Sequence, residues 1–155
     1  MRWHLPLLTC ALAACSTPYQ TMGFTGGVDS QQITGTTYRI VARGNAYTGG
    51  TTIQDYTLLK AAETTKAAGG THFAIISASD ASSTGYVTTG STAQTSFVGN
   101  TAYTTFNPGS VYNYVKPGQD TYIRVFTIAP GQPPLPSTLS ADEIVQFVGS
   151  RVKRG

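Results

Sequence analysis

Charged residues are scarce in this chain. They make up 11% of its 155 residues, whereas an average globular protein has about 25%. The high isoelectric point of about 9.0 therefore reflects a scarcity of charge more than a basic surface. A nucleic-acid-binding protein needs clustered Lys and Arg to contact phosphates, so the composition argues against a nucleic-acid partner.

Cysteine and histidine are equally rare, with two of each. His4 and Cys10 fall within the first 14 residues, which have the features of a cleaved export signal, so Cys15 and His72 remain in the mature chain. One cysteine cannot form an internal disulfide, and stability must then come from packing. With one histidine, a zinc site would need carboxylates for most of its ligands. We therefore expect neither a metal nor a cofactor.

The apolar run at the N-terminus, residues 5–12, is too short to span a bilayer, which takes about 20 residues. It follows Arg2, and two small residues separate it from Cys15. This order is typical of an export signal. The stretch Leu12-Ala13-Ala14-Cys15 is in turn typical of a lipobox, the site where a bacterial lipoprotein signal is cut. We therefore predict a lipoprotein signal peptide at residues 1–14.

Lipidation of Cys15 follows from this interpretation. Its thiol would take up a diacylglyceryl group, and the freed amine a further acyl chain such as palmitate. One chain binds a membrane only reversibly, whereas two or three make the attachment effectively permanent. Ser16 comes next, and by the sorting habit of Gram-negative lipoproteins a residue other than Asp favours the outer membrane, here its periplasmic face. The alternatives are a free thiol in an N-terminal helix, or an ordinary signal peptide that ends nearby.

The mature chain divides into a tether and one domain. Residues 15–36 are rich in Gly, Thr, Ser and Gln and have little apolar periodicity, so we predict a flexible tether. Residues 37–155 are enough for one globular domain with a core. Within this domain, residues 80–100 form a Ser/Thr/Gly-rich insertion, which composition assigns either to edge strands or to a mobile loop.

The periodicity of the domain predicts an α/β (α+β) fold in a single two-layer domain. Residues 38–43 alternate as a strand does, with Tyr38, Ile40 and Ala42 on the side facing the core. Residues 72–77 are apolar on both faces, which is typical of a central strand. A helix between them gives a strand–helix–strand unit, whose simplest form is a right-handed crossover with parallel strands.

The first helix is predicted at residues 52–68. Thr52 and Asp55 resemble a capping box at its start, and Gly69-Gly70 is a typical end.

A β-hairpin and a last helix follow in the prediction. Strands at residues 111–115 and 122–128 flank Pro117-Gly118, which is a turn signal. Ser140 and Glu143 form a capping box for a C-terminal helix that runs to about residue 152.

Several motifs resemble those of a family of small, uncharacterised Gram-negative lipoproteins. The shared outline consists of the lipobox, Pro18-Tyr19-Gln20, Gly26-Gly27, Tyr38 followed by Gly44-Asn45-Ala46-Tyr47-Thr48, the helical stretch from Asp55 to Glu63, and Gly70 with Phe73. The resemblance covers residues 15–79, has almost no match from 80 to 120, and is loose in the last helix. It implies an envelope location and a fold, but no catalytic residue, because the family has no assigned activity.

Glu63 is the first candidate binding residue. It lies three residues from Lys60 and from Lys66 on the predicted helix, so one interpretation is an exposed ladder of ion pairs. The other interpretation is a binding cleft in which Glu63 faces Arg39 or Arg43.

Tyrosines give a second candidate site. Tyr112 and Tyr114, together with Tyr103 and Tyr122, offer flat apolar faces with polar tips that suit a glycan or a peptide. The alternative is that they are half-buried positions of a sheet.

The cations at the C-terminus give a third. Arg151, Lys153 and Arg154 are suited to anionic headgroups or lipopolysaccharide. Alternatively, they stabilise the carboxyl end of the last helix.

These features predict an outer-membrane lipoprotein with a non-enzymatic binding or scaffolding role, held to the membrane through Cys15 and open to another envelope protein as partner. One alternative is an envelope hydrolase that uses His72 with a serine, although a satisfied structural histidine is the simpler interpretation of that position. Another is a carrier of an apolar ligand, which requires a cavity beneath the sheet.

Overall fold

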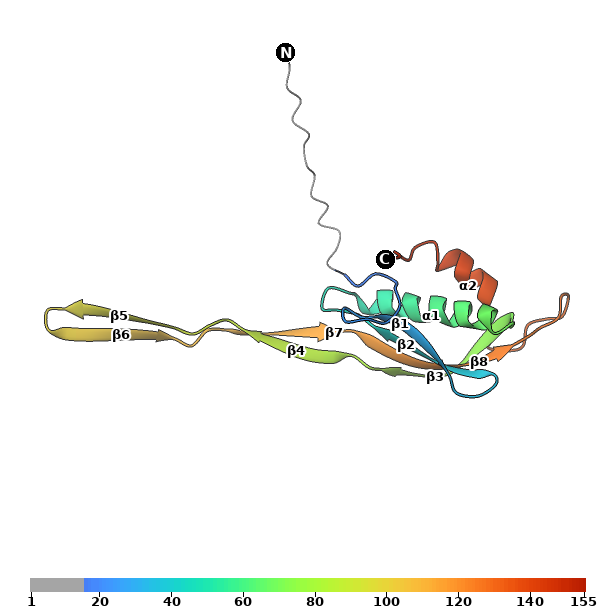
Figure 1. Ribbon diagram of the computed structural model, residues 1–155, viewed down its shortest axis with the longest axis horizontal. Coiled ribbons are helices and arrows are strands. Elements are labelled where there is room, and N and C mark those ends of the chain that lie inside the picture. The colour runs from blue at the N-terminus through green and yellow to red at the C-terminus, as the bar shows by residue number, and fades with distance from the viewer. Residues whose placement is uncertain (1–15) are drawn as a thin grey trace, which may run out of the picture.

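A computed structural model describes residues 16–155. The predicted signal peptide, residues 1–14, and the predicted lipidation site, Cys15, lie outside the described residues. Within 16–155 the elements in chain order are β1 (Gly27–Gln32), β2 (Thr37–Arg43), α1 (Gly50–Ala67), β3 (His72–Asp80), β4 (Ser83–Thr88), β5 (Thr92–Val98), β6 (Thr101–Asn107), β7 (Val111–Lys116), β8 (Gly118–Phe126), β9 (Leu139–Ser140) and α2 (Ala141–Phe147). This part of the chain is therefore mostly β with two helices (Figure 1).

A five-stranded sheet forms the body, in the order β1-β2-β8-β3-β9, and all its neighbouring strands are antiparallel. The strand–helix–strand order is present as β2–α1–β3, but these two strands are not neighbours. β8 lies between them and is antiparallel to both, so β2 and β3 run in the same direction without pairing. The central strand is β8, whose inward residues Thr121, Ile123 and Val125 are buried.

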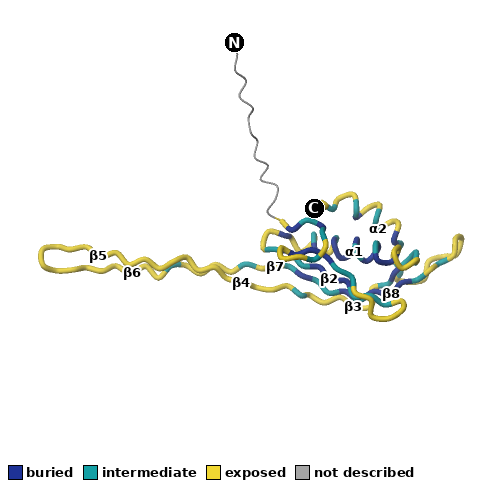
Figure 2. The backbone as a smooth tube through the Cα atoms, in the orientation of Figure 1, coloured by how far each residue is buried: buried dark blue, intermediate teal, exposed yellow. Residues whose placement is uncertain are grey.

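One face of the sheet carries the core. α1 lies across this face and α2 packs against α1 (Figures 1 and 2). Ile40 and Ala42 of β2 are fully buried, as the alternation predicted. Tyr38 on the same side is half-buried and packs against the core cluster that contains Ile40 and Phe73. Among residues 16–155, no helix covers the opposite face of the sheet (Figure 1), which is common for an antiparallel sheet with one solvated face.

The helix ends agree only in part with the predicted caps. α1 begins at Gly50 with Gly49 as N-cap and without a side-chain cap, so the predicted box of Thr52 and Asp55 is wrong, because the helix starts before it. At the other end Gly69 has a φ of 77°, a left-handed conformation that glycine adopts without strain. Ser140 caps α2 by accepting a hydrogen bond from the Glu143 N–H, as predicted.

Residues 16–36 do not form the flexible tether that their composition predicted. β1 pairs with β2 over its whole length, and Val28 is 2% exposed. Farther towards the N-terminus, Thr17 and Tyr19 are buried as well. The composition does not show this, because few apolar residues, Tyr19 and Val28 among them, join the core, while hydrogen bonds fix the rest of the segment to the body.

Thr17 is the centre of these hydrogen bonds. Its backbone N–H donates to Thr48 Oγ1 (2.9 Å), and its carbonyl accepts from the Tyr56 hydroxyl (2.9 Å). Its own hydroxyl donates to the Thr25 carbonyl (2.7 Å) and accepts from the Asn45 N–H (3.0 Å). One buried threonine thus joins the N-terminal segment, the β2–α1 loop and α1.

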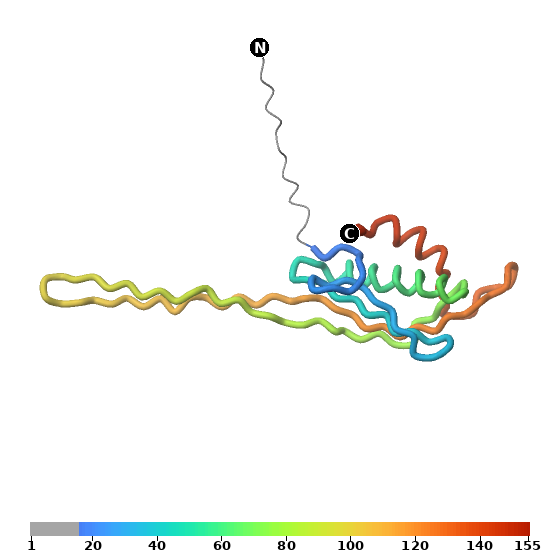
Figure 3. The backbone as a smooth tube through the Cα atoms, in the orientation of Figure 1, coloured from blue at the N-terminus to red at the C-terminus, as the bar shows by residue number. Residues whose placement is uncertain are grey.

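The region after residue 76 forms a long two-stranded arm instead of an insertion beside a hairpin. β3 and β8 continue beyond the sheet as β4 with β7 and then β5 with β6 (Figures 1 and 3). The same register holds from the pair Ser77↔Tyr122 to the pair Val98↔Thr101. We call residues 83–116 the arm.

The predicted hairpin between residues 111–115 and 122–128 is therefore wrong, because β7 pairs with β4 and not with β8. A type II turn needs a positive φ at the glycine, and Gly118 is not among the positive-φ residues. Instead the chain runs straight through Pro117-Gly118, whose carbonyls accept from the N–H groups of Gly44 (2.8 Å) and Ala81 (3.0 Å), respectively.

We predict that Thr17→Val lowers the free energy of unfolding by about 1–3 kcal/mol, because it leaves buried hydrogen-bonding groups without their hydroxyl partner. Urea denaturation of the purified protein measures this change. The matched control is Thr21→Val, at an exposed side chain of the same segment, where we expect a change within about 0.5 kcal/mol. Equal losses in the two variants would contradict the role assigned to Thr17.

Candidate functional site

Glu63 lies in a cluster that joins both ends of the described chain to α1. Its Oε2 accepts a hydrogen bond from the Tyr19 hydroxyl (2.5 Å), and its Oε1 pairs with Arg154 (2.9 Å). The Arg154 guanidinium also lies 5.2 Å from the centroid of the Tyr19 ring. The predicted ladder is not formed at one side, since Lys66 pairs with Asp142 of α2 (2.5 Å).

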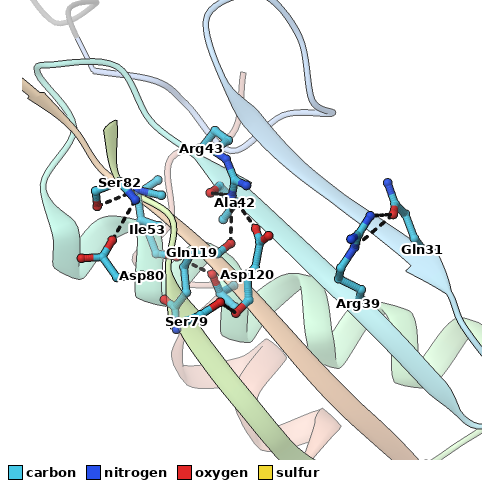
Figure 4. Close-up of polar contacts among 12 residues, drawn as sticks. Gln31, Arg39, Ala42, Arg43, Ile53, Ser79, Asp80, Ser82, Gln119 and Asp120 are labelled. Atoms are coloured by element: carbon cyan, nitrogen blue, oxygen red, sulfur yellow. Dashed lines mark hydrogen bonds and ion pairs between the residues drawn. The ribbon is translucent and has the colours of Figure 1, made fainter. Parts of the chain in front are cut away.

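Arg39 and Arg43 do not meet Glu63. They project from β2 on the side opposite Ile40 and Ala42, and therefore away from α1. Figure 4 shows Arg43 paired with Asp120 (2.7 Å) and Arg39 beside the side-chain carbonyl of Gln31. The sheet separates these cations from Glu63, so the predicted cleft does not exist.

Burial raises the pKa of the Tyr19 phenol, and the hydrogen bond and negative charge of Glu63 raise it further, while Arg154 opposes them. The folded protein therefore keeps this proton at pH values where the unfolded chain loses it. The protonated Tyr19 phenol therefore contributes its full stabilisation of the folded state below about pH 10, the ordinary pKa of tyrosine. This contribution decreases as the pH rises above that value. The titration of Tyr19 therefore lowers the free energy of unfolding at alkaline pH.

We predict that Tyr19→Phe makes the free energy of unfolding less dependent on pH between about pH 9 and about pH 11. Urea denaturation at several pH values measures the slope in wild type and variant. Tyr47→Phe is the control, because Tyr47 is 74% exposed, and it should keep the wild-type slope. The pKa assignment is wrong if Tyr19→Phe also keeps that slope.

A cleft of about 560 Å³ lies where the N-terminal segment meets the C-terminus, lined by Ser16, Pro18, Thr52, Asp55, Tyr56 and residues 151–154. Arg151 closes one side with two hydrogen bonds to the Asp55 carboxylate (2.6 and 2.8 Å). Of the predicted headgroup cations, Arg151 and Arg154 are therefore paired with acids of α1. They do not stabilise the end of α2, which stops at Phe147.

His72 opens β3, opposite Phe126 on β8 and Ser140 on β9. Within residues 16–155, the one side-chain hydrogen-bond partner of its ring is the Thr71 hydroxyl (2.9 Å). Ser140 is close in register, but its hydroxyl caps α2. The same residues contain no group of three or more His, Cys, Asp or Glu arranged to hold a metal ion.

The tyrosines do not form one platform. Tyr122 belongs to the sheet of the body, and Tyr103 lies near the end of the arm. Tyr112 and Tyr114 share one face of β7. The Tyr114 ring covers Gly85 so closely that an added Cβ there would lie 2.4 Å from it, and Lys116 lies over the same ring at 5.6 Å. Of this pair, Tyr112 is therefore the one whose ring is open to a ligand, with 62% of the residue exposed.

The arm is the surface that stands out. Apart from Lys116 at its base it contains no Asp, Glu, Lys, Arg or His. Nevertheless, apart from the half-buried Tyr114, its large apolar side chains are at least 55% exposed: Tyr86, Val87, Phe97, Val98, Tyr103, Phe106, Val111, Tyr112 and Val115. Exposed apolar groups concentrated in one region mark interaction surfaces.

Phe97 and Phe106 were not among the predicted site residues. A signal for them was present, because Thr-Ala-x-Thr-x-Phe occurs at residues 92–97 and again at 101–106. Each copy has the alternation of a strand, with Ala, Thr and Phe on one side.

No protein family, curated protein or solved structure matches this chain. The resemblance to small lipoproteins therefore stays a prediction. Neither α1 nor α2, the helices of residues 16–155, is long and apolar enough to cross a bilayer.

Proposed function

We propose that the protein is a lipoprotein held in the outer membrane by acyl chains on Cys15, facing the periplasm, and that it works by binding or scaffolding and not by catalysis. In this proposal the five-stranded sheet and its helices form a two-layer α/β body. The body carries the arm and presents it to a protein of the envelope. The chain would then belong with the small envelope lipoproteins that its motifs resemble.

The uncharged, exposed arm is the observation that supports this role. Residues 83–88 pair with 111–116, and residues 92–98 pair with 101–107; at about 3.3 Å per residue, the arm has a reach of roughly 50 Å. An isolated two-stranded ribbon is marginally stable in water. A chain that extends one so far from its core, with apolar side chains on it, gains most by covering it with a partner.

The edges of the arm point to the same conclusion. Natural edge strands are protected against pairing by charges, especially lysine, or by proline and bulges. β4, β5 and β6 carry no charged residue and no proline. Their unpaired backbone groups are therefore available to add strands from a partner.

The alternative functions have less support. A hydrolase would need a nucleophile within reach of His72, and the serine nearest in register, Ser140, is used as a helix cap. A carrier would need a cavity beneath the sheet. The apolar cleft there, between α1 and the β3 side, has a volume of about 210 Å³, which is below the roughly 300–1,000 Å³ of ordinary ligand sites.

We predict that mass spectrometry of the protein from native membranes finds a chain that begins at an acylated Cys15. Cys15→Ser should remain uncut, since the processing reaction needs the lipidated cysteine. Cys10→Ser is the matched control, because that residue lies inside the predicted signal, and it should be processed normally. An unmodified Cys15 thiol in the wild type, or a wild-type chain that still begins with Met1, would contradict the anchor.

The non-enzymatic role has its own test. We expect protein purified from membranes to leave peptidoglycan fragments, esters and peptides unchanged, with His72→Ala as comparison. Turnover that disappears in a well-folded His72→Ala variant would establish the hydrolase instead. A thermal unfolding curve shows whether this variant is folded.

A further inference from the structure

The end of the arm carries one motif twice. β5 contains Thr92-Ala93-Gln94-Thr95-Ser96-Phe97, and β6 contains Thr101-Ala102-Tyr103-Thr104-Thr105-Phe106. The register pairs Ala93 with Phe106, Thr95 with Thr104, and Phe97 with Ala102. Residues directly opposite one another in an antiparallel pair project from the same side. These six residues therefore form one face, which we call the tip face.

The tip face has an approximate two-fold symmetry. Rotation by half a turn about an axis through the Thr95–Thr104 pair, perpendicular to the ribbon, exchanges the two strands. It places Phe97 on Phe106 and Ala93 on Ala102. The two phenylalanines thus occupy one diagonal of the face as projections, and the two alanines occupy the other diagonal as hollows.

The tip face is also prepared for burial. Phe97 and Phe106 are 75% and 63% exposed. The two threonine hydroxyls at its centre lie 2.9 Å apart and hydrogen-bond to each other. Burying a hydroxyl is costly mainly when it loses its partner, and these two would keep theirs. The opposite side of β5 and β6 is mixed, since it carries the polar Gln94, Ser96 and Thr105 together with Val98 and Tyr103.

We infer that the tip face packs against the tip face of a second copy of this chain, with the two arms side by side and pointing the same way. A two-fold axis along the arms then sets Phe97 over Ala102 of the second copy and Phe106 over its Ala93. This inference rests on the proposed binding role of the arm and names its partner.

Two observations favour a second copy over a different protein. Each phenylalanine lies opposite an alanine across the strand pair, which makes the face complementary to itself under a two-fold axis along the arm. The absence of charge between residues 81 and 115 removes the like-charge contacts that would otherwise oppose two identical arms.

The expected interface is small. An aromatic side chain buries on the order of 150–250 Å², so four phenylalanines bury roughly 600–1,000 Å². Stable complexes bury about 1,200–2,000 Å². We therefore expect a weak, concentration-dependent dimer in solution.

Analytical ultracentrifugation of the mature lipoprotein in detergent, over a range of concentrations, tests the inference. We expect Phe97→Ala to weaken self-association at least tenfold, because it removes a projection. Ala102→Phe should weaken it similarly, because it fills the hollow. The double variant Phe97→Ala/Ala102→Phe exchanges projection and hollow, and we expect it to restore association to within about threefold of the wild type.

The double variant also distinguishes the two possible directions of packing. It keeps the same pair of residue types across β5 and β6, so the ribbon loses little of its own stability. With antiparallel arms it would place two phenylalanines, at positions 102 and 106, over each other and would stay weak. Tyr103→Ala, on the other face of β6, is the control for lost aromatic area and should leave association within twofold of the wild type.

Each result decides the inference. Restoration by the double variant supports the parallel two-fold packing. A wild type that stays monomeric at all concentrations overturns it, as does a dimer that the single variants do not weaken or the double variant does not restore. The anchored binding role is tested separately, by mass spectrometry of Cys15 and by the assays for catalytic turnover. A monomeric wild type would leave that role intact if the arm binds a different protein.

Discussion

The pairing of β3 with β8 is the contact on which the rest of this structure depends. At one end these strands lie in the sheet beneath α1, where Phe73 and Ile123 are fully buried. At the other end, after a register shift between Ile75 and Ser77, they continue in one register into the arm. The core therefore fixes the direction of a ribbon that has no core of its own. The pair of β3 and β8 lies between β2 and β9 in the sheet, so the strands that extend into the arm are held on both sides.

The two ends of the described chain are held by polar contacts. Thr17 fixes the N-terminal segment to the body, while Tyr19 and Arg154 meet at Glu63 of α1. A membrane anchor at Cys15 would therefore be followed directly by an ordered body. The arm would then have a defined orientation relative to the anchor, whereas a flexible tether would randomise it. A fixed orientation is useful to a protein that binds at a particular place in the envelope.

The sequence was sufficient to predict elements that depend on local patterns, such as alternation in a strand or a capping residue at a helix end. Alternation placed Ile40 and Ala42 in the core, and Gly69 and Ser140 marked helix ends. It was insufficient where pairing depends on distant residues. Pro117-Gly118 is a turn signal in isolation, but the register of β3 with β8 carries the chain straight through it. Likewise, the Ser/Thr/Gly-rich composition of residues 80–100 suits an edge strand or a mobile loop equally, and only the pairing with distant residues shows that β5 is a strand of the arm.

Glu63 shows the same limit for a candidate site. Its neighbours on the helix were visible in the sequence, but Tyr19 and Arg154 reach it from opposite ends of the chain. Arg39 and Arg43 do not reach Glu63, because the face of β2 that carries them points away from α1.

The most direct test of the central claim, that the arm is the interaction surface, is photo-crosslinking in intact cells. A benzophenone analogue of phenylalanine at position 97 should give an adduct, and the same analogue at position 147, an exposed phenylalanine of α2, should not. Adducts from position 147 alone, or from neither, would contradict the account.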